Sequence, residues 1–143
     1  EDIVVKNFEN IFKVSKFKWL TYLSATSVYG DHKGEWVDEK SKTSPTSSTG
    51  SNRLKAEKSW MELAENLKLP LQIFRLSGIY SNESNVLRRL KSGDAKIIKK
   101  ENQFFSRIHV EDIAEVLYKS LGNPNVSYIS NAFFPEIMLE SAF

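Results

Sequence analysis

A hydroxyl and a long cation lie four residues apart near the start of a predicted helix. An apolar stripe at i, i+3, i+4 and i+7 indicates the helix, at Trp60, Leu63, Ala64 and Leu67. Followed upstream in steps of three and four residues, the stripe reaches Arg53 and then Thr49. A cation on a core-facing stripe needs an anionic or polar partner, which makes Arg53 a candidate ligand-binding residue. The alternative is that Arg53 reaches past the helix end to solvent or pairs with a neighbour.

Two apolar, β-prone runs flank this helix and predict parallel strands of one sheet. Residues 19–23 lead into Ser24 and Ala25, and residues 71–76 lead into Ser77. Open α/β sheets bind their ligands beyond the carboxyl ends of the strands, so these small and hydroxyl side chains mark the expected site. The two strands and the helix between them predict a βαβ unit.

Three ordered motifs resemble those of the extended short-chain dehydrogenase/reductases, also called the NAD-dependent epimerase/dehydratase family. They are Val28-Tyr29-Gly30 at the end of the first strand, the stretch from Arg75 to Tyr80, and the stretch from Arg107 to Ala114, which is similar to the family's Ile-His-Val-x-Asp signature. The chain is most similar to an atypical, nucleoside-diphosphate-sugar epimerase-like branch. The resemblance implies an α/β fold, a partial Rossmann-type parallel sheet with flanking helices and a small substrate lobe around residues 82–105. It covers residues 1–125, and we expect residues 126–143 to be a divergent or truncated tail.

The residues at the family's catalytic positions are substituted in this chain. The family's Tyr-x-x-x-Lys pair falls on Thr49 and Arg53, its catalytic Ser or Thr on Ala25, and an acidic position of the branch on Asp2. In family members the Tyr is the general acid/base, the Lys lowers its pKa, and the hydroxyl orients the substrate. An aliphatic hydroxyl has no pKa near neutrality, so Thr49 does not replace the Tyr, whereas Arg53 keeps the positive charge.

The resemblance also implies a nicotinamide cofactor, NADP or NAD. Arg53 is expected to hold the cofactor ribose, and the other expected cofactor-binding residues are Ser24, Leu76, Ser77, Gly78 and Ile79. The family's Gly-x-x-Gly-x-x-Gly turn, which binds the cofactor pyrophosphate, does not occur in the 143 residues. We therefore expect the N-terminal half of the dinucleotide fold to be absent and the chain to be a C-terminal fragment.

Three functions fit these residues. The first is an NAD(P)-dependent epimerase/dehydratase or reductase that acts on a nucleotide sugar or small carbonyl compound and whose catalytic residues are degenerate. The second is a non-catalytic nucleotide-sensing or partner-binding module of the same fold. The third is a non-functional gene fragment. A fold family hosts many functions, so the resemblance alone does not separate them.

The composition of the chain limits the kinds of partner and site that we expect. Twenty basic and eighteen acidic residues give a net charge of +2, which does not favour nucleic-acid binding. The absence of cysteine excludes a disulfide framework and a thiolate metal site and fits a cytoplasmic protein, and no run of about eighteen apolar residues predicts a membrane span. Basic residues at 88–100 suit a phosphate-bearing substrate, with a solvated surface as the alternative. Apolar strands without their neighbours predict self-association.

Overall fold

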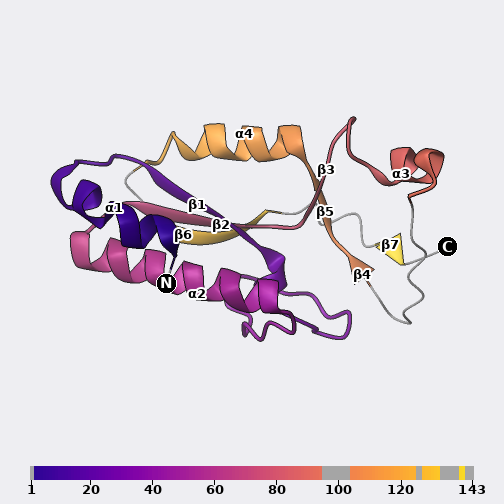
Figure 1. Ribbon diagram of the computed structural model, residues 1–143, viewed down its shortest axis with the longest axis horizontal. Helices are drawn as coiled ribbons and strands as arrows, with labels where there is room; N and C mark the ends of the chain where they lie inside the picture. Colours follow the sequence, from indigo (N-terminus) through magenta and orange to yellow (C-terminus); the bar gives the residue numbers. More distant parts are fainter. Residues whose placement is uncertain (1, 95–103, 125–126, 133–138, 141–143) are drawn as a thin grey trace.

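The computed structural model describes residues 2–94, 104–124, 127–132 and 139–140. Within them, the main sheet consists of parallel strands β1 (Leu20–Ala25), β2 (Leu71–Leu76) and β6 (Tyr128–Ala132), in the order β1-β2-β6. This is the predicted α/β architecture with its parallel sheet (Figure 1). Because β6 belongs to the sheet, the sheet continues past residue 125.

Helices cover both faces of the sheet. Helices α1 (Ile3–Val14) and α2 (Ser48–Leu67) lie on one face and α4 (Val110–Ser120) on the other (Figure 1). Side chains alternate along β2, so Ile73 packs in the core under α1 and α2 while Phe74 packs with Ile113 of α4. All six residues of β2 are buried, as expected of a central strand covered on both faces, and two of them, Gln72 and Arg75, are polar.

Helix α2 buries a different face from the one that the sequence predicts. Ser47 caps it, accepting a hydrogen bond at 3.0 Å from the Gly50 amide, and Lys68 ends it with a left-handed φ of 52°. Its buried residues are Gly50, Glu57, Trp60, Leu63 and Ala64. The prediction that Thr49 faces the core is therefore wrong, since Thr49 is exposed. The predicted buried face misses Glu57, which is fully buried, because an acidic residue is not expected on a core-facing stripe.

A smaller group of elements follows β2. Strand β3 (Gly78–Tyr80) pairs in parallel with β5 (Arg107–His109), and β4 (Phe104–Phe105) pairs antiparallel with β7 (Leu139–Glu140). With the short helix α3 (Val86–Ser92), they lie beyond one end of the main sheet (Figure 1). The substrate lobe expected around residues 82–105 falls partly here, and its residues 95–103 lie outside the described part of the chain.

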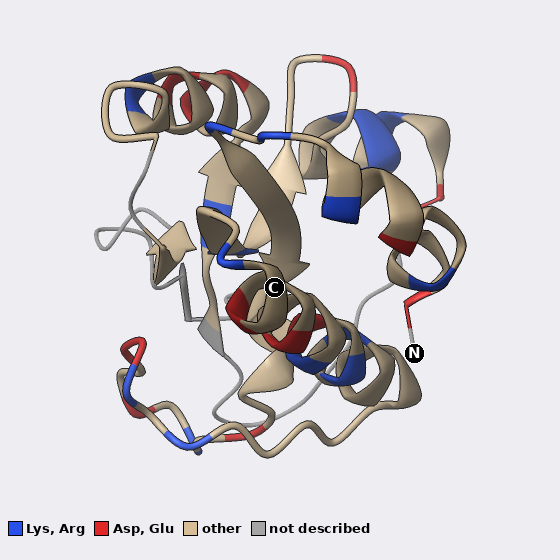
Figure 2. Ribbon diagram, turned by 90° about the vertical axis from the view of Figure 1, so that its left-hand side faces the viewer, with Lys and Arg blue, Asp and Glu red and all other residues tan. Residues whose placement is uncertain are grey.

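The surface carries charged residues of both signs and several exposed apolar side chains. Basic and acidic residues are interspersed along the same helices (Figure 2). Helix α1 buries Val5 and Phe12 but leaves Ile3, Ile11 and Val14 at least half exposed. Strand β1 pairs only with β2 among the described strands, so one of its edges is open.

Candidate functional site at the carboxyl edge of the sheet

The carboxyl ends of β1 and β2 lie side by side. The strands are in register, with Ser24 opposite Arg75 and Ala25 opposite Leu76. Strand β1 continues into a short 3₁₀ turn, η1 (Thr26–Val28), and β2 continues into Ser77. The structure thus brings together the predicted residues from both strands, at the edge where parallel sheets bind ligands.

Arg53 reaches this edge from α2. Its Nη1 donates a hydrogen bond to the Leu23 carbonyl oxygen at 3.1 Å, and the side chain is half-buried. One bond leaves other guanidinium donors for a ligand, because the group carries five N–H bonds. Thr49 lies one turn earlier, with its side chain exposed.

Ser24 is oriented toward α2. Its Oγ donates to Glu57 Oε1, and the residue is only 4% exposed. Ala25, the next residue on the strand, points to the opposite face because side chains alternate along a strand. The hydroxyl of Ser24 therefore serves a buried carboxylate, and its predicted contact with a cofactor remains a prediction.

Arg75 and Glu57 form a buried ion pair next to the site. The sequence analysis did not predict Glu57 as the partner. Arg75 donates to both carboxylate oxygens of Glu57, from Nε at 3.0 Å and from Nη2 at 2.8 Å. Burial opposes the charge of Arg75, but the hydrogen bonds to Glu57 and Tyr29 outweigh it and raise its pKa above the ordinary value. The signal in the sequence was Arg75 itself, because a charge inside a mostly apolar strand requires a buried partner.

The ion pair continues into a phenol and an amide. Arg75 Nη1 donates to the Tyr29 hydroxyl at 2.8 Å, and that hydroxyl donates to Asn131 Oδ1 at 2.8 Å. The backbone N–H of Asn131 donates to Glu39 Oε1 at 2.7 Å, which ties the loop before α2 to β6. Tyr29 is 2% exposed with its hydroxyl bonded on both sides, so it is not placed to exchange a proton with a ligand.

Two polar residues named in the sequence analysis, Asp2 and His109, are the N-caps of helices. Asp2 accepts hydrogen bonds from the Val4 and Val5 amides at 2.9 and 3.4 Å and is the N-cap of α1. His109 caps α4 through a 3.4 Å hydrogen bond from the Glu111 amide to Nδ1. Both therefore have a structural role that accounts for their positions.

The segment from Leu76 to Ile79 changes from buried to exposed. Leu76 and Ser77 are buried, whereas Gly78 is exposed and Ile79 is 53% exposed. The Gly78 amide donates to the Ser106 carbonyl at 3.1 Å, which fixes the backbone against β5. A ligand at this edge would meet Gly78 and Ile79 first.

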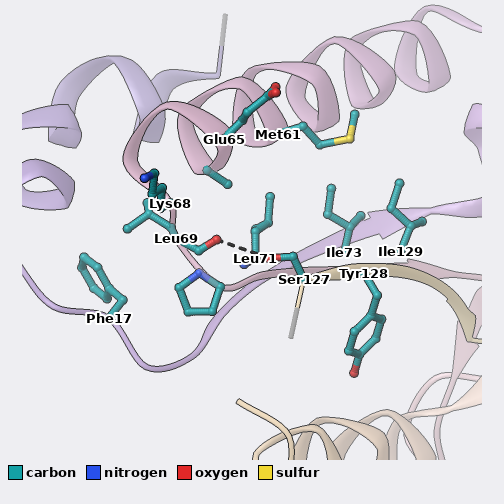
Figure 3. Close-up of a pocket in the computed structure, with 12 residues that line it drawn as sticks. Phe17, Met61, Glu65, Lys68, Leu69, Leu71, Ile73, Ser127, Tyr128 and Ile129 are labelled. Carbon is teal, nitrogen blue, oxygen red and sulfur yellow. Dashed lines mark hydrogen bonds between the residues drawn. The ribbon is translucent and has the colours of Figure 1, made fainter. Parts of the chain in front are cut away.

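The molecule also has an open groove of about 640 Å³ near the amino ends of the strands. Figure 3 shows Leu71, Ile73 and Ile129 pointing up from the sheet toward α2, while Tyr128 points to the other face. The charged residues of its lining are Glu65 and Lys68, near the end of α2. The groove contains none of the predicted site residues.

Two further kinds of site find no support in the described residues. They contain no group of three or more His, Cys, Asp or Glu side chains arranged to hold a metal ion. No described helix combines the length and apolar character needed to cross a membrane.

Solved structures match the chain closely in shape. A functionally unknown conserved protein from Silicibacter pomeroyi is 40% identical, with a TM-score of 0.83 over 96% of this chain and 48% of its own. UDP-glucuronic acid 4-epimerase from Bacillus cereus, in complex with NAD, is 18% identical, with a TM-score of 0.81 over 94% of this chain and 47% of its own. MoeE5, in complex with UDP-glucose and NAD, is 19% identical, with a TM-score of 0.78 over 92% and 47%.

The chain spans about half the length of these solved proteins. No family model and no curated protein matches the sequence. The fold of these solved proteins is the α/β fold that the three sequence motifs imply.

Proposed function

We propose that this chain, which has the fold of the extended short-chain dehydrogenase/reductases, supplies the nucleotide-sugar-binding part of an NAD(P)-binding protein. The observation that carries the proposal is the aligned carboxyl ends of β1 and β2, with Arg53 of α2 bonded to the Leu23 carbonyl beside them. Structures of the same fold are complexes with NAD and UDP-sugars. The same edge is where physical principles place a ligand.

In this proposal Arg53 holds the cofactor ribose or a phosphate through its remaining donors. The exposed turn at Gly78 and Ile79 lines the nicotinamide, and Leu76 and Ser77 support that turn from below. The cofactor is NAD or NADP, and the protein works in the cytoplasm. Residues 1–125 form the cofactor and substrate domain, to which β6 adds a third strand.

The family's proton transfer is lost or displaced in this proposal. Thr49 is exposed and carries no ionisable group at neutral pH, Ala25 has no hydroxyl, and Asp2 caps α1. The phenol of Tyr29 is buried and bonded on both sides, so it does not take over the role. The chain is therefore proposed to bind nucleotide sugars without the family's usual acid/base catalysis.

The experiment that tests the proposal is a titration of the purified chain with UDP-glucose and, separately, with NADH. UDP-glucose should bind saturably, which intrinsic tryptophan fluorescence or ligand-observed NMR would detect. NADH should bind weakly, because the sequence contains no Gly-rich turn for the pyrophosphate. A chain that binds neither ligand would not have the proposed function.

A second function, binding to another protein chain, is supported by apolar surface and a strand edge. Helix α1 exposes Ile3 by 72% and Val14 by 83%, and β1 pairs with β2 alone among the described strands, which leaves its other edge open there. Apolar surface and an unpaired strand both favour association, so we propose that the chain self-associates. Sedimentation over a range of concentrations tests this, and a monomer at every concentration would contradict it.

A further inference from the structure

Helix α3 (Val86–Ser92) has no buried residue and lies apart from the main sheet and its covering helices (Figure 1). Local contacts close both of its ends. The Asn85 side chain accepts a hydrogen bond at 3.0 Å from the Arg88 amide, and Gly93 ends the helix with a left-handed φ of 78°. A helix this short is marginal in water unless one of its faces is packed. We therefore expect α3 to meet a surface that the described part of the chain does not provide.

The helix presents an apolar stripe to solvent. Val86, Leu87 and Leu90 lie at positions i, i+1 and i+4, which places them on one side of the helix. Their exposed fractions are 65%, 66% and 57%. Single exposed apolar residues are ordinary on a protein surface, whereas a contiguous group of them marks an interaction site.

Two basic side chains border this stripe. Successive residues of a helix turn by about 100°, so Arg89 and Lys91 lie at the two margins of the stripe and Arg88 lies on the opposite side. Arg88 pairs with Glu83 at 3.2 Å. Arg89 and Lys91 are exposed and form no ion pair within the described part of the chain. The cations nearest the apolar stripe are therefore available to an anionic partner.

We propose that α3 docks the protein on an anionic membrane surface. The apolar stripe enters the boundary between headgroups and acyl chains, and the long side chains of Arg89 and Lys91 reach the lipid phosphates. Charge complementarity selects this partner, because α3 contains no acidic residue and the cytoplasmic leaflet carries anionic lipids. With three apolar residues and two cations, the binding is weak and reversible.

Docking of this kind needs no membrane-spanning helix, so it agrees with the absence of one among the described helices. It also does not depend on which ligand binds at the carboxyl edge of the sheet, and it stands or falls separately from the proposed function.

Sedimentation of the full 143-residue chain with lipid vesicles tests the proposal. One set of vesicles contains equal parts of phosphatidylserine and phosphatidylcholine, and the other contains phosphatidylcholine alone. Binding to the anionic vesicles should be roughly 10- to 30-fold tighter, since each cation near an anionic surface contributes roughly fivefold. Arg89→Gln with Lys91→Gln should remove this difference. Leu87→Gln with Leu90→Gln should weaken binding to the anionic vesicles by roughly tenfold or more, because less apolar surface is buried.

The matched control is Tyr118→Gln with Leu121→Gln, at the end of α4. These two side chains are 77% and 47% exposed, so the control removes exposed apolar surface from another helix and should leave vesicle binding unchanged. Because α3 has no buried residue, its variants should unfold at the same temperature as the wild type. A lost affinity in them is then not a lost fold.

Three results would overturn the proposal. The first is equal binding to neutral and anionic vesicles, and the second is binding that persists when the apolar stripe of α3 is replaced. The third is a chain that sediments with neither kind of vesicle, which would leave the exposed face of α3 to a protein partner.

Discussion

Two arginines near the carboxyl edge of the sheet show how differently one side chain is used. Arg75 is 4% exposed and its guanidinium is saturated by Glu57 and Tyr29. Arg107 is exposed, packs on Gly78 and has no described acceptor. A buried cation has to be neutralised where it is, so it serves the fold, whereas an exposed one that is already positioned can serve a ligand.

The largest effect that this comparison predicts is on stability, at Glu57. Replacing Glu57→Leu leaves Arg75 charged and buried without its carboxylate, which should lower the free energy of unfolding by about 3–5 kcal/mol. Urea unfolding would measure the loss. The matched control is the double variant Glu57→Leu with Arg75→Met, which removes both charges and should recover most of the stability. An equally unstable double variant would mean that packing, and not the unpaired charge, causes the loss.

A smaller loss of stability is expected at Tyr29. The change Tyr29→Phe removes the hydroxyl that joins Arg75 to Asn131, leaving a buried donor and a buried acceptor with one partner fewer. The free energy of unfolding should fall by about 1–3 kcal/mol. Tyr22→Phe is a suitable comparison, because Tyr22 packs on Trp60 through its ring. Similar losses in the two variants would show that the Tyr29 hydroxyl is not part of a stabilising network.

Arg53 should affect stability less and ligand binding more. Arg53→Ala removes one hydrogen bond, to the Leu23 carbonyl, so the expected loss is about 1 kcal/mol of unfolding free energy. If Arg53 also contacts the ligand, its removal should weaken UDP-glucose or NADH binding by more than that loss explains. Unchanged affinity for both ligands would show that Arg53 only links α2 to β1 and does not contact the ligand.

The smallest effect is expected at Thr49, the position of the family's catalytic tyrosine. Its side chain is exposed, so Thr49→Ala should change the free energy of unfolding by less than about 0.5 kcal/mol. The affinity for UDP-glucose should also be unchanged. A clear loss of affinity on this substitution would show that the threonine hydroxyl contacts the ligand.

The sequence predicted those parts of the fold that depend on local pattern. Apolar runs gave the strands close to their observed bounds, and their aligned carboxyl ends followed from the parallel arrangement. The burial of Glu57 was missed because acidic side chains ordinarily face solvent, and its partner lies 18 residues away on another element. The exposure of Thr49 was missed for the same reason, since the buried face of α2 was traced without Glu57.

The candidate site was predicted less completely than the fold. Its location followed from the strand ends, but the state of each side chain depends on contacts between distant segments. The packing of Arg107 on Gly78, for example, depends on the register of β3 and β5, which the sequence does not give. Basic residues near 88–100 attracted notice because they are clustered, yet Arg88 is paired with a neighbouring glutamate.

The most direct test of the account is to map where UDP-glucose binds, by following amide chemical shifts of the chain during a titration. The account predicts that the perturbed amides cluster at the carboxyl edge, around Arg53, Gly78 and Ile79. Amides lining the apolar groove, such as those of Met61 and Ile129, should stay unchanged. Perturbations confined to the groove, or none at saturating ligand, would contradict the claim that the carboxyl edge is the binding site.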